Sequence, residues 1–131
     1  LNKSITKNKL SDDLIDLMLL QAQKFLEEIG EFFPYASVLS SDEELTTIGI
    51  YNDSDNDFNA KKAINIFQNN IQKEIENGSV LIGAIGIDVL IKETNENAIM
   101  VKVTDDGIEW HERNFLYTIK NNVVEIEKYN P

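Results

Sequence analysis

Three aspartates at alternate positions, Asp53, Asp55 and Asp57, have the spacing of the first three ligands of a calcium-binding loop. Such a loop also needs a glycine at its sixth position and a glutamate at its twelfth, for the sharp turn and the last ligand. Those positions hold Phe58 and Ile64 in this chain. We therefore interpret the aspartates as an acidic helix cap, with weak adventitious cation binding as the alternative, and expect neither a metal site nor a cofactor.

The only histidine in the chain is His111, so a site built from several histidines is excluded. In an extended segment Glu109, His111 and Arg113 would share one face, where they could bind a ligand or support acid–base chemistry. We favour a solvated face, because the sequence shows no partner that would position the imidazole. The alternative is a pocket on a sheet face that combines the three residues with Asp88 and Tyr117.

A single carboxylate, Asp88, interrupts an apolar run between Ile87 and Val89. A buried, unpaired carboxylate costs several kcal/mol, so we expect Asp88 to be exposed or paired, with a functional role as the alternative. The chain has no cysteine, no phosphate-binding glycine loop and no nucleophile elbow, so we do not expect an enzyme. The lack of cysteine excludes disulfides and fits a cytoplasmic protein.

Acidic residues are concentrated in the first half of the chain. Residues 10–57 contain twelve acidic side chains and one basic side chain, Lys24, and this stretch accounts for the whole net charge of −11. A surface of this kind attracts basic proteins and repels nucleic acid and anionic lipid. We therefore expect a basic protein partner and neither nucleic acid nor membrane binding; the alternative is that the acids only provide solubility.

The elements that position these residues are predicted to follow the order α-β-β-α-β-β-β-β. We expect a flexible leader over residues 1–10 and a single α+β domain over residues 11–131, with the first helix capped by Ser11 and ended by Gly30. Asp106–Gly107 and Asn121–Asn122 predict tight hairpin turns between adjacent strands. Adjacent strands joined by hairpins favour an antiparallel sheet of five to six strands with both helices packed on one face.

Several segments of the chain carry a resemblance to a known family. The end of the first helix reads Phe25-Leu-Glu-Glu-Ile-Gly-Glu-Phe-Phe-Pro-Tyr35, and the later strands contain Gly86-Ile-Asp-Val89, Asn97-Ala-Ile-Met-Val101 and Leu116-Tyr117. Over residues 22–126 the chain resembles a group of small bacterial domains of unassigned function with a Gly-Glu-Phe-Tyr-Pro-Phe motif after the first helix. It departs from that pattern at Phe33, Tyr35 and Ser37. The resemblance implies no catalytic residues, and some members of the group are immunity-like.

From the charge and the resemblance we predict a non-enzymatic, acidic protein-binding module, with an immunity-type inhibitor of a basic toxin as its specific form. Aromatic side chains of the Phe32–Tyr35 segment either close one end of the core or, if exposed, anchor the partner. The alternative function is a small-molecule-binding or enzymatic domain with a pocket around His111. The predicted binding residues are Glu27, Glu28, Glu31, Phe33, Tyr35, Asp42, Glu43, Glu44, Asp53, Asp55 and Asp57.

Overall fold

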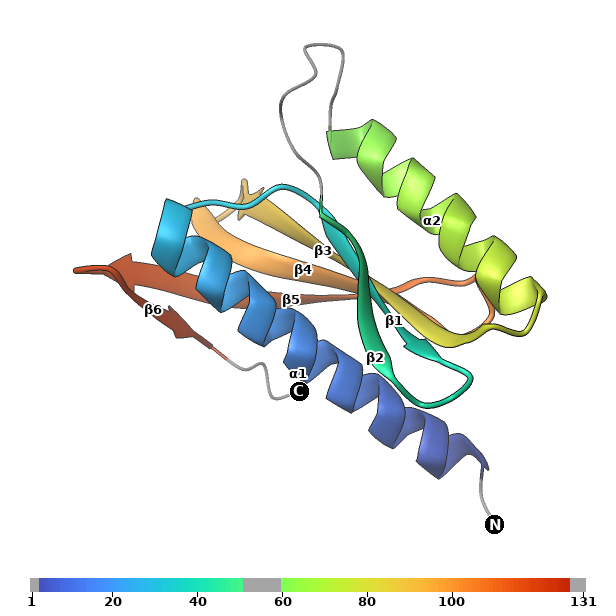
Figure 1. Cartoon of the computed structure of the whole chain (residues 1–131). Helices are drawn as coiled ribbons and strands as arrows, with labels where there is room; N and C mark the ends of the chain where they lie inside the picture. The colour runs from blue at the N-terminus through green and yellow to red at the C-terminus, as the bar shows by residue number, and fades with distance from the viewer. Residues whose placement is uncertain (1–2, 51–59, 128–131) are drawn as a thin grey trace.

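The computed structural model describes residues 3–50 and 60–127, which form two helices and one six-stranded antiparallel sheet (Figure 1). This arrangement confirms the predicted α+β class and the predicted order of the elements. No helix in the described ranges is both long enough and apolar enough to cross a bilayer. The elements are α1 (Lys3–Ile29), β1 (Tyr35–Ser40), β2 (Leu45–Ile50), α2 (Ala60–Glu76), β3 (Val80–Ile91), β4 (Glu96–Thr104), β5 (His111–Lys120) and β6 (Val123–Ile126).

Helix α1 begins earlier than the sequence predicts. Its first residue is Lys3 rather than the residue after Ser11, so residues 3–10 are helical where we expected a flexible leader. This segment contains neither glycine nor proline, and nothing in it breaks the helix. The other end of α1 is as predicted: Gly30 has a φ of +88° and donates its N–H to the carbonyl of Leu26 at 2.9 Å.

The two predicted hairpin turns have different outcomes. Asn121 and Asn122 have φ values of +53° and +64° and join β5 to β6, which confirms a tight turn of the type that favours asparagine. Between β4 and β5, however, the chain forms a six-residue loop over 105–110 in place of a two-residue turn. The prediction was wrong here because the Asp106 side chain accepts hydrogen bonds from backbone N–H groups of the loop and so stabilises the longer connection.

The sheet has the strand order β2-β1-β3-β4-β5-β6, so β2 and β6 are its edges. The pairing of β1 with β2 is interrupted: Ala36 lies opposite Gly49 and Ser37 lies opposite Thr47, which leaves Ile48 as an extra residue in β2. Near the other edge, β5 pairs with β4 through its first half and with β6 through its second half. The sheet is therefore continuous but irregular toward both edges.

The two helices pack on opposite faces of the sheet, and our prediction that they share one face was wrong. Helix α1 covers a core that includes Tyr35, Ala84 and Val101, whereas α2 covers a core that includes Ala36 and Ile85. Figure 1 shows the central strands lying between the two helices. Neighbouring residues of one strand thus face different helices, as side-chain alternation requires when both faces are buried.

Two glycines of β3 let the layers approach closely. A Cβ atom at Gly83 would lie 2.5 Å from Ile71 of α2, and one at Gly86 would lie closer than 3.0 Å to the ring of Tyr35. The Tyr35 hydroxyl donates a hydrogen bond to the carbonyl of Met18 in α1. Gly86 therefore provides the space in which a buried tyrosine joins the sheet to α1.

Candidate functional site

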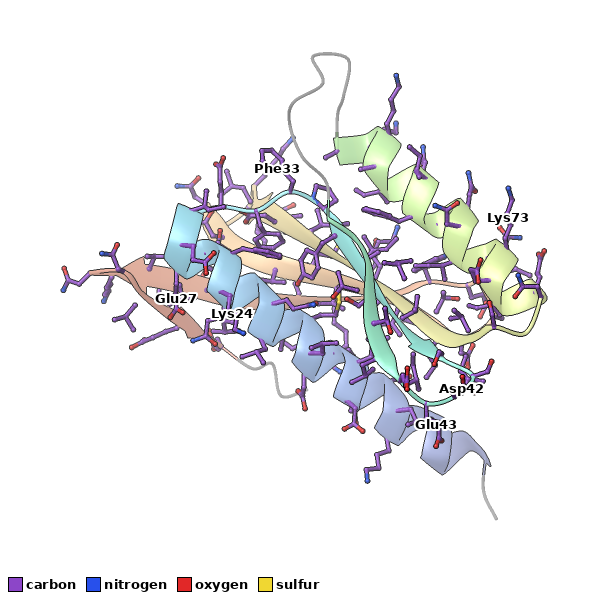
Figure 2. The ribbon with its side chains drawn as sticks, viewed as in Figure 1. Lys24, Glu27, Phe33, Asp42, Glu43 and Lys73 are labelled. Carbon is purple, nitrogen blue, oxygen red and sulfur yellow. The ribbon has the colours of Figure 1, made fainter. Side chains whose placement is uncertain are left out.

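The acidic residues predicted to form one binding surface lie at two ends of the molecule. Glu27 and Glu28 belong to the last turn of α1, and Glu31 follows that helix just before β1. Asp42, Glu43 and Glu44 form the turn after β1. These ends are separated by the six residues of β1, which span about 20 Å. Figure 2 shows Glu27 at one end and Asp42 and Glu43 at the other, so the early acids do not form one surface.

The end that carries Asp42 also collects carboxylates from later segments. In the antiparallel sheet, the β1–β2 turn, the α2–β3 turn and the β4–β5 loop all lie at the same end, because Ser40 pairs with Val80 and Gly83 pairs with Thr104. All of the carboxylates there are exposed. We call this surface the acidic end, and its members are Asp42, Glu43, Glu44, Glu74, Glu76, Asp105, Asp106 and Glu109.

Direct contacts hold the three turns of the acidic end together. The Ser41 N–H donates to the carbonyl of Ser79 at 3.0 Å, which links the β1–β2 turn to the α2–β3 turn. A Cβ atom at Gly107 would lie 2.8 Å from the Cα of Gln72, so the β4–β5 loop rests on α2. The Gln72 side chain in turn donates to Glu76 at 3.2 Å. Lys73 is the basic residue of these three segments, which therefore carry an excess of negative charge; the N-terminal part of α1, which contains Lys9, lies at the same end of the molecule (Figure 1).

The β4–β5 loop of the acidic end is organised by Asp106. Its Oδ1 atom accepts the N–H groups of Ile108 at 2.8 Å and Glu109 at 2.9 Å, and these hydrogen bonds hold the pKa of Asp106 below its usual range. The Thr104 hydroxyl accepts the N–H of Gly107 at 2.8 Å. The loop thereby presents Ile108, whose side chain is 72% exposed, on a fixed backbone.

The aromatic residues expected to anchor a partner behave differently from one another. Tyr35 is completely buried and cannot be an exposed anchor, which corrects that part of our prediction. Its ring packs edge-on against Phe25 at 5.3 Å and Phe32 at 5.5 Å, so the aromatic segment closes this end of the core. Phe33 is 39% exposed, and it lies at the end of the molecule opposite Asp42 (Figure 2).

Asp53, Asp55 and Asp57 lie outside the described residues, and so does the helix cap predicted for them. Within residues 3–50 and 60–127, no three acidic or histidine side chains come close enough together to hold a metal ion.

Glu109, His111 and Arg113 do not form the predicted trio on one strand face. Strand β5 begins at His111, and Glu109 belongs to the preceding loop. His111 is exposed, while the Arg113 guanidinium lies over the ring of Phe115 at 5.2 Å from its centroid. His111 and Tyr117 are six positions apart along β5, a distance of about 20 Å. The alternative pocket is therefore not assembled as a whole.

Asp88 and Tyr117, the other two residues of the predicted alternative pocket, do contact each other. The Tyr117 hydroxyl donates to Oδ1 of Asp88 at 2.7 Å, and the Phe32 N–H donates to Oδ2 at 3.4 Å. Asp88 is half-buried and lines an open hollow of about 430 Å³, which we call the Asp88 hollow. Its other lining residues are Gly30, Glu31, Val89, Leu90, Asn97, Tyr117 and Ile119.

The electrostatics of the Asp88 hollow follow from its burial. Desolvation raises the pKa of Asp88, and the like charge of Glu31 acts in the same direction, whereas the hydrogen bonds from Tyr117 and Phe32 oppose the rise. Burial also raises the pKa of Tyr117, and its hydrogen bond to Asp88 adds to that effect. At neutral pH Tyr117 is thus a permanent donor, and Asp88 is a carboxylate whose ionisation costs more than usual.

Sequence reasoning missed the contributions of Glu74, Glu76, Asp105 and Asp106 to the acidic end, and the exposed position of Ile108. The available signal was topological: in an antiparallel sheet, turns that follow strands of the same direction meet at one end. The pairing of Asp88 with Tyr117 had no comparable signal, because the strand register was unknown. No protein-family model, no curated protein and no solved structure matches this chain. The family resemblance therefore rests on the sequence motifs alone.

Proposed function

We propose that this chain is a non-enzymatic binding module for a basic protein, and that the acidic end is its docking surface. The observation that carries the proposal is the convergence of eight exposed carboxylates from three separate segments at one end of the molecule. Such a field speeds the encounter with a Lys/Arg-rich surface and orients it. The same field opposes binding of nucleic acid and anionic lipid. An immunity-type inhibitor of a basic toxin is the specific form that we favour.

An exposed apolar side chain in one segment of this surface supports the proposal. Ile108 is exposed within the β4–β5 loop, between Asp106 and Glu109. Interfaces gain most of their affinity from a few apolar or aromatic anchors surrounded by polar side chains. Because Asp106 fixes the loop, Ile108 would lose little conformational entropy on binding. In this proposal Ile108 takes the anchoring role that we first assigned to Tyr35.

The test begins with capture of partners from the source cells at low and high salt, identified by mass spectrometry. Two variants with the same change in net charge then distinguish attraction by the acidic end from attraction by the net charge of the whole protein. One variant carries Asp42→Asn, Glu43→Gln and Glu44→Gln at the acidic end, and its matched control removes three carboxylates at the opposite end, at Glu27, Glu28 and Glu93.

We expect the acidic-end variant to slow association with the captured basic protein about tenfold at low salt, and the control variant to change it less than twofold. An Ile108→Ser variant should leave the association rate unchanged and accelerate dissociation about tenfold. If no salt-sensitive basic protein is captured, or if both charge variants act equally, the acids serve solubility and the proposal fails.

A further inference from the structure

The Asp88 carboxylate has unused hydrogen-bonding capacity inside the Asp88 hollow. It accepts one hydrogen bond on each oxygen, from Tyr117 at 2.7 Å and from the Phe32 N–H at 3.4 Å. An ionised carboxylate has about four acceptor positions, so about half of them are free. Because Asp88 lines the hollow, an incoming donor can reach them.

The hollow also lacks a compensating positive charge. Two of its lining residues are acidic, Asp88 and Glu31, and no Lys or Arg of the described segments lines it. The charge that acts on Asp88 is the like charge of Glu31, which adds to the cost of ionising a half-buried group. Asn97 lines the same hollow, and the oxygen of its side-chain amide is a third potential acceptor. The hollow thus offers acceptors and negative charge to whatever enters it.

An apolar surface borders these acceptors. Leu90 is 54% exposed and Ile119 is 39% exposed, and both line the hollow. Leu90 belongs to β3, two residues beyond Asp88, and Ile119 belongs to β5, two residues beyond Tyr117. Since side chains alternate along a strand, each apolar residue lies on the same face as its polar neighbour. A charged group and a short hydrocarbon chain can therefore be accommodated side by side.

We propose that the Asp88 hollow binds an alkylammonium group, with its three N–H donors directed at Asp88, Glu31 and Asn97 and its hydrocarbon stem against Leu90 and Ile119. An ammonium group has three donors and no acceptor, which matches a wall of three acceptors. This inference does not depend on the proposed function, because the hollow lies at the end of the sheet opposite the acidic end. Two sources share the required chemistry: a free amine and a lysine side chain of another protein.

A purely structural role for Asp88 makes a different prediction. If Asp88 only fixed the segment after α1 through the Phe32 N–H, an asparagine could accept that hydrogen bond on its single carbonyl oxygen without the cost of burying a charge, while its NH₂ group donated to the Tyr117 hydroxyl. The test is therefore a titration of the whole chain with n-butylammonium, followed by backbone amide NMR shifts at Phe32 and Leu90. Neutral 1-butanol serves as the control for the hydrocarbon stem.

We expect saturable shifts at Phe32 and Leu90 with millimolar n-butylammonium, weakening of at least tenfold in an Asp88→Asn variant, and no saturation with 1-butanol. Binding should strengthen as the pH rises through the raised pKa of Asp88, with Glu31 and Tyr117 as the other titratable groups that face it. Should Asp88→Asn fail to fold, Glu31→Gln replaces it, because Glu31 is exposed, with an expected weakening of about threefold.

The two sources are distinguished by a second titration with Nα-acetyl-lysine amide. Equal affinity indicates that a protein lysine can enter the hollow, whereas binding of n-butylammonium alone indicates a free amine. The proposal is overturned if n-butylammonium produces no shifts at Phe32 and Leu90, if shifts at Asp42 are as large as those at Phe32, or if Asp88→Asn and Glu31→Gln bind as tightly as the unmodified chain.

Discussion

Replacing Gly86 with alanine tests whether Tyr35 is a buried structural residue or a binding anchor. The new Cβ atom would lie closer than 3.0 Å to Cε1, Cζ and Oη of Tyr35, a separation that real side chains do not tolerate. The ring must move, and its movement strains the hydrogen bond from the Tyr35 hydroxyl to the carbonyl of Met18. Overpacking of this kind costs about 1–3 kcal/mol, and an unsatisfied buried hydroxyl adds about 1–3 kcal/mol.

An alanine also lowers the conformational entropy of the unfolded chain, which offsets about 0.4–1 kcal/mol of this loss in stability. The net loss in the free energy of unfolding should therefore be about 2–4 kcal/mol. For a chain of this length that corresponds to a fall in Tm of roughly 10 °C, measurable by calorimetry and by urea unfolding. Gly30→Ala is the control for backbone strain, because Gly30 has a positive φ but no atom within 4 Å of the point that a Cβ atom would occupy.

The same substitution in a Tyr35→Leu background isolates the overlap with the ring. Leucine cannot fill the position of the phenol ring, so Gly86→Ala should cost at least 1 kcal/mol less there, about the coupling expected for residues in contact. Equal costs in both backgrounds, or a loss below about 0.5 kcal/mol in the unmodified background, would refute our description of this contact. Gly86→Ala should leave the association with a basic partner unchanged in both the unmodified and the Tyr35→Leu backgrounds.

Three further predictions concern single positions. Tyr117→Phe should lower the free energy of unfolding by about 1–2 kcal/mol at neutral pH and by less at acidic pH. The reason is that the hydrogen bond from the Tyr117 hydroxyl stabilises the ionised form of Asp88, whose pKa is raised in the folded state. Urea unfolding at several pH values measures the difference. Asp106→Ala should lower Tm at neutral pH, and the difference in Tm from the unmodified chain should disappear as the pH falls through the lowered pKa of Asp106. A difference in Tm that persists at low pH, measured by thermal unfolding, would contradict this prediction. Asn122→Gly should raise the free energy of unfolding by about 0.5 kcal/mol, because a φ of +64° suits glycine better than asparagine; a decrease in stability would show that the asparagine side chain contributes to the turn.

Local signals in the sequence predicted the elements well. Gly30 and Gly78 end their helices with φ values of +88° and +85°, and Asn121–Asn122 forms the expected turn. These outcomes depend on the conformational preferences of one or two residues, which tertiary contacts did not override. The β4–β5 loop was mispredicted because Asp106 and Thr104 bind backbone N–H groups of the loop, and this competes with a two-residue turn.

The placement of the two helices on opposite faces of the sheet was predicted incorrectly. Strand β1 is buried over Tyr35–Leu39, and β3 is buried over Ile82–Gly86, without the apolar–polar alternation of a strand with one wet face. A continuous buried run of this kind indicates that both faces are covered. The prediction of both helices on one face was based on adjacent strands joined by hairpins, a pattern that does not reveal whether one face of the sheet is covered or both.

The candidate sites were predicted least well, because each depends on residues brought together by the register of the sheet. The early acids were predicted to form one surface because they are close in sequence, yet Glu31 and Asp42 lie at opposite ends of β1. The acids that do converge come from turns that are far apart along the chain. Likewise Asp88 and Tyr117 meet only because β3, β4 and β5 are aligned as they are.

The extra residue in β2 has a consequence for the behaviour of this chain at high concentration. Strand β2 is an edge strand over Leu45–Ile50, with no charge and no proline to discourage another molecule from extending the sheet. Ile48 interrupts its pairing pattern and bends the strand out of the straight line that a second copy would need as a template. Since Leu45–Ile50 itself carries no charge, we expect the irregular pairing at Ile48, rather than electrostatic repulsion within the strand, to disfavour the addition of a strand from a second molecule at this edge.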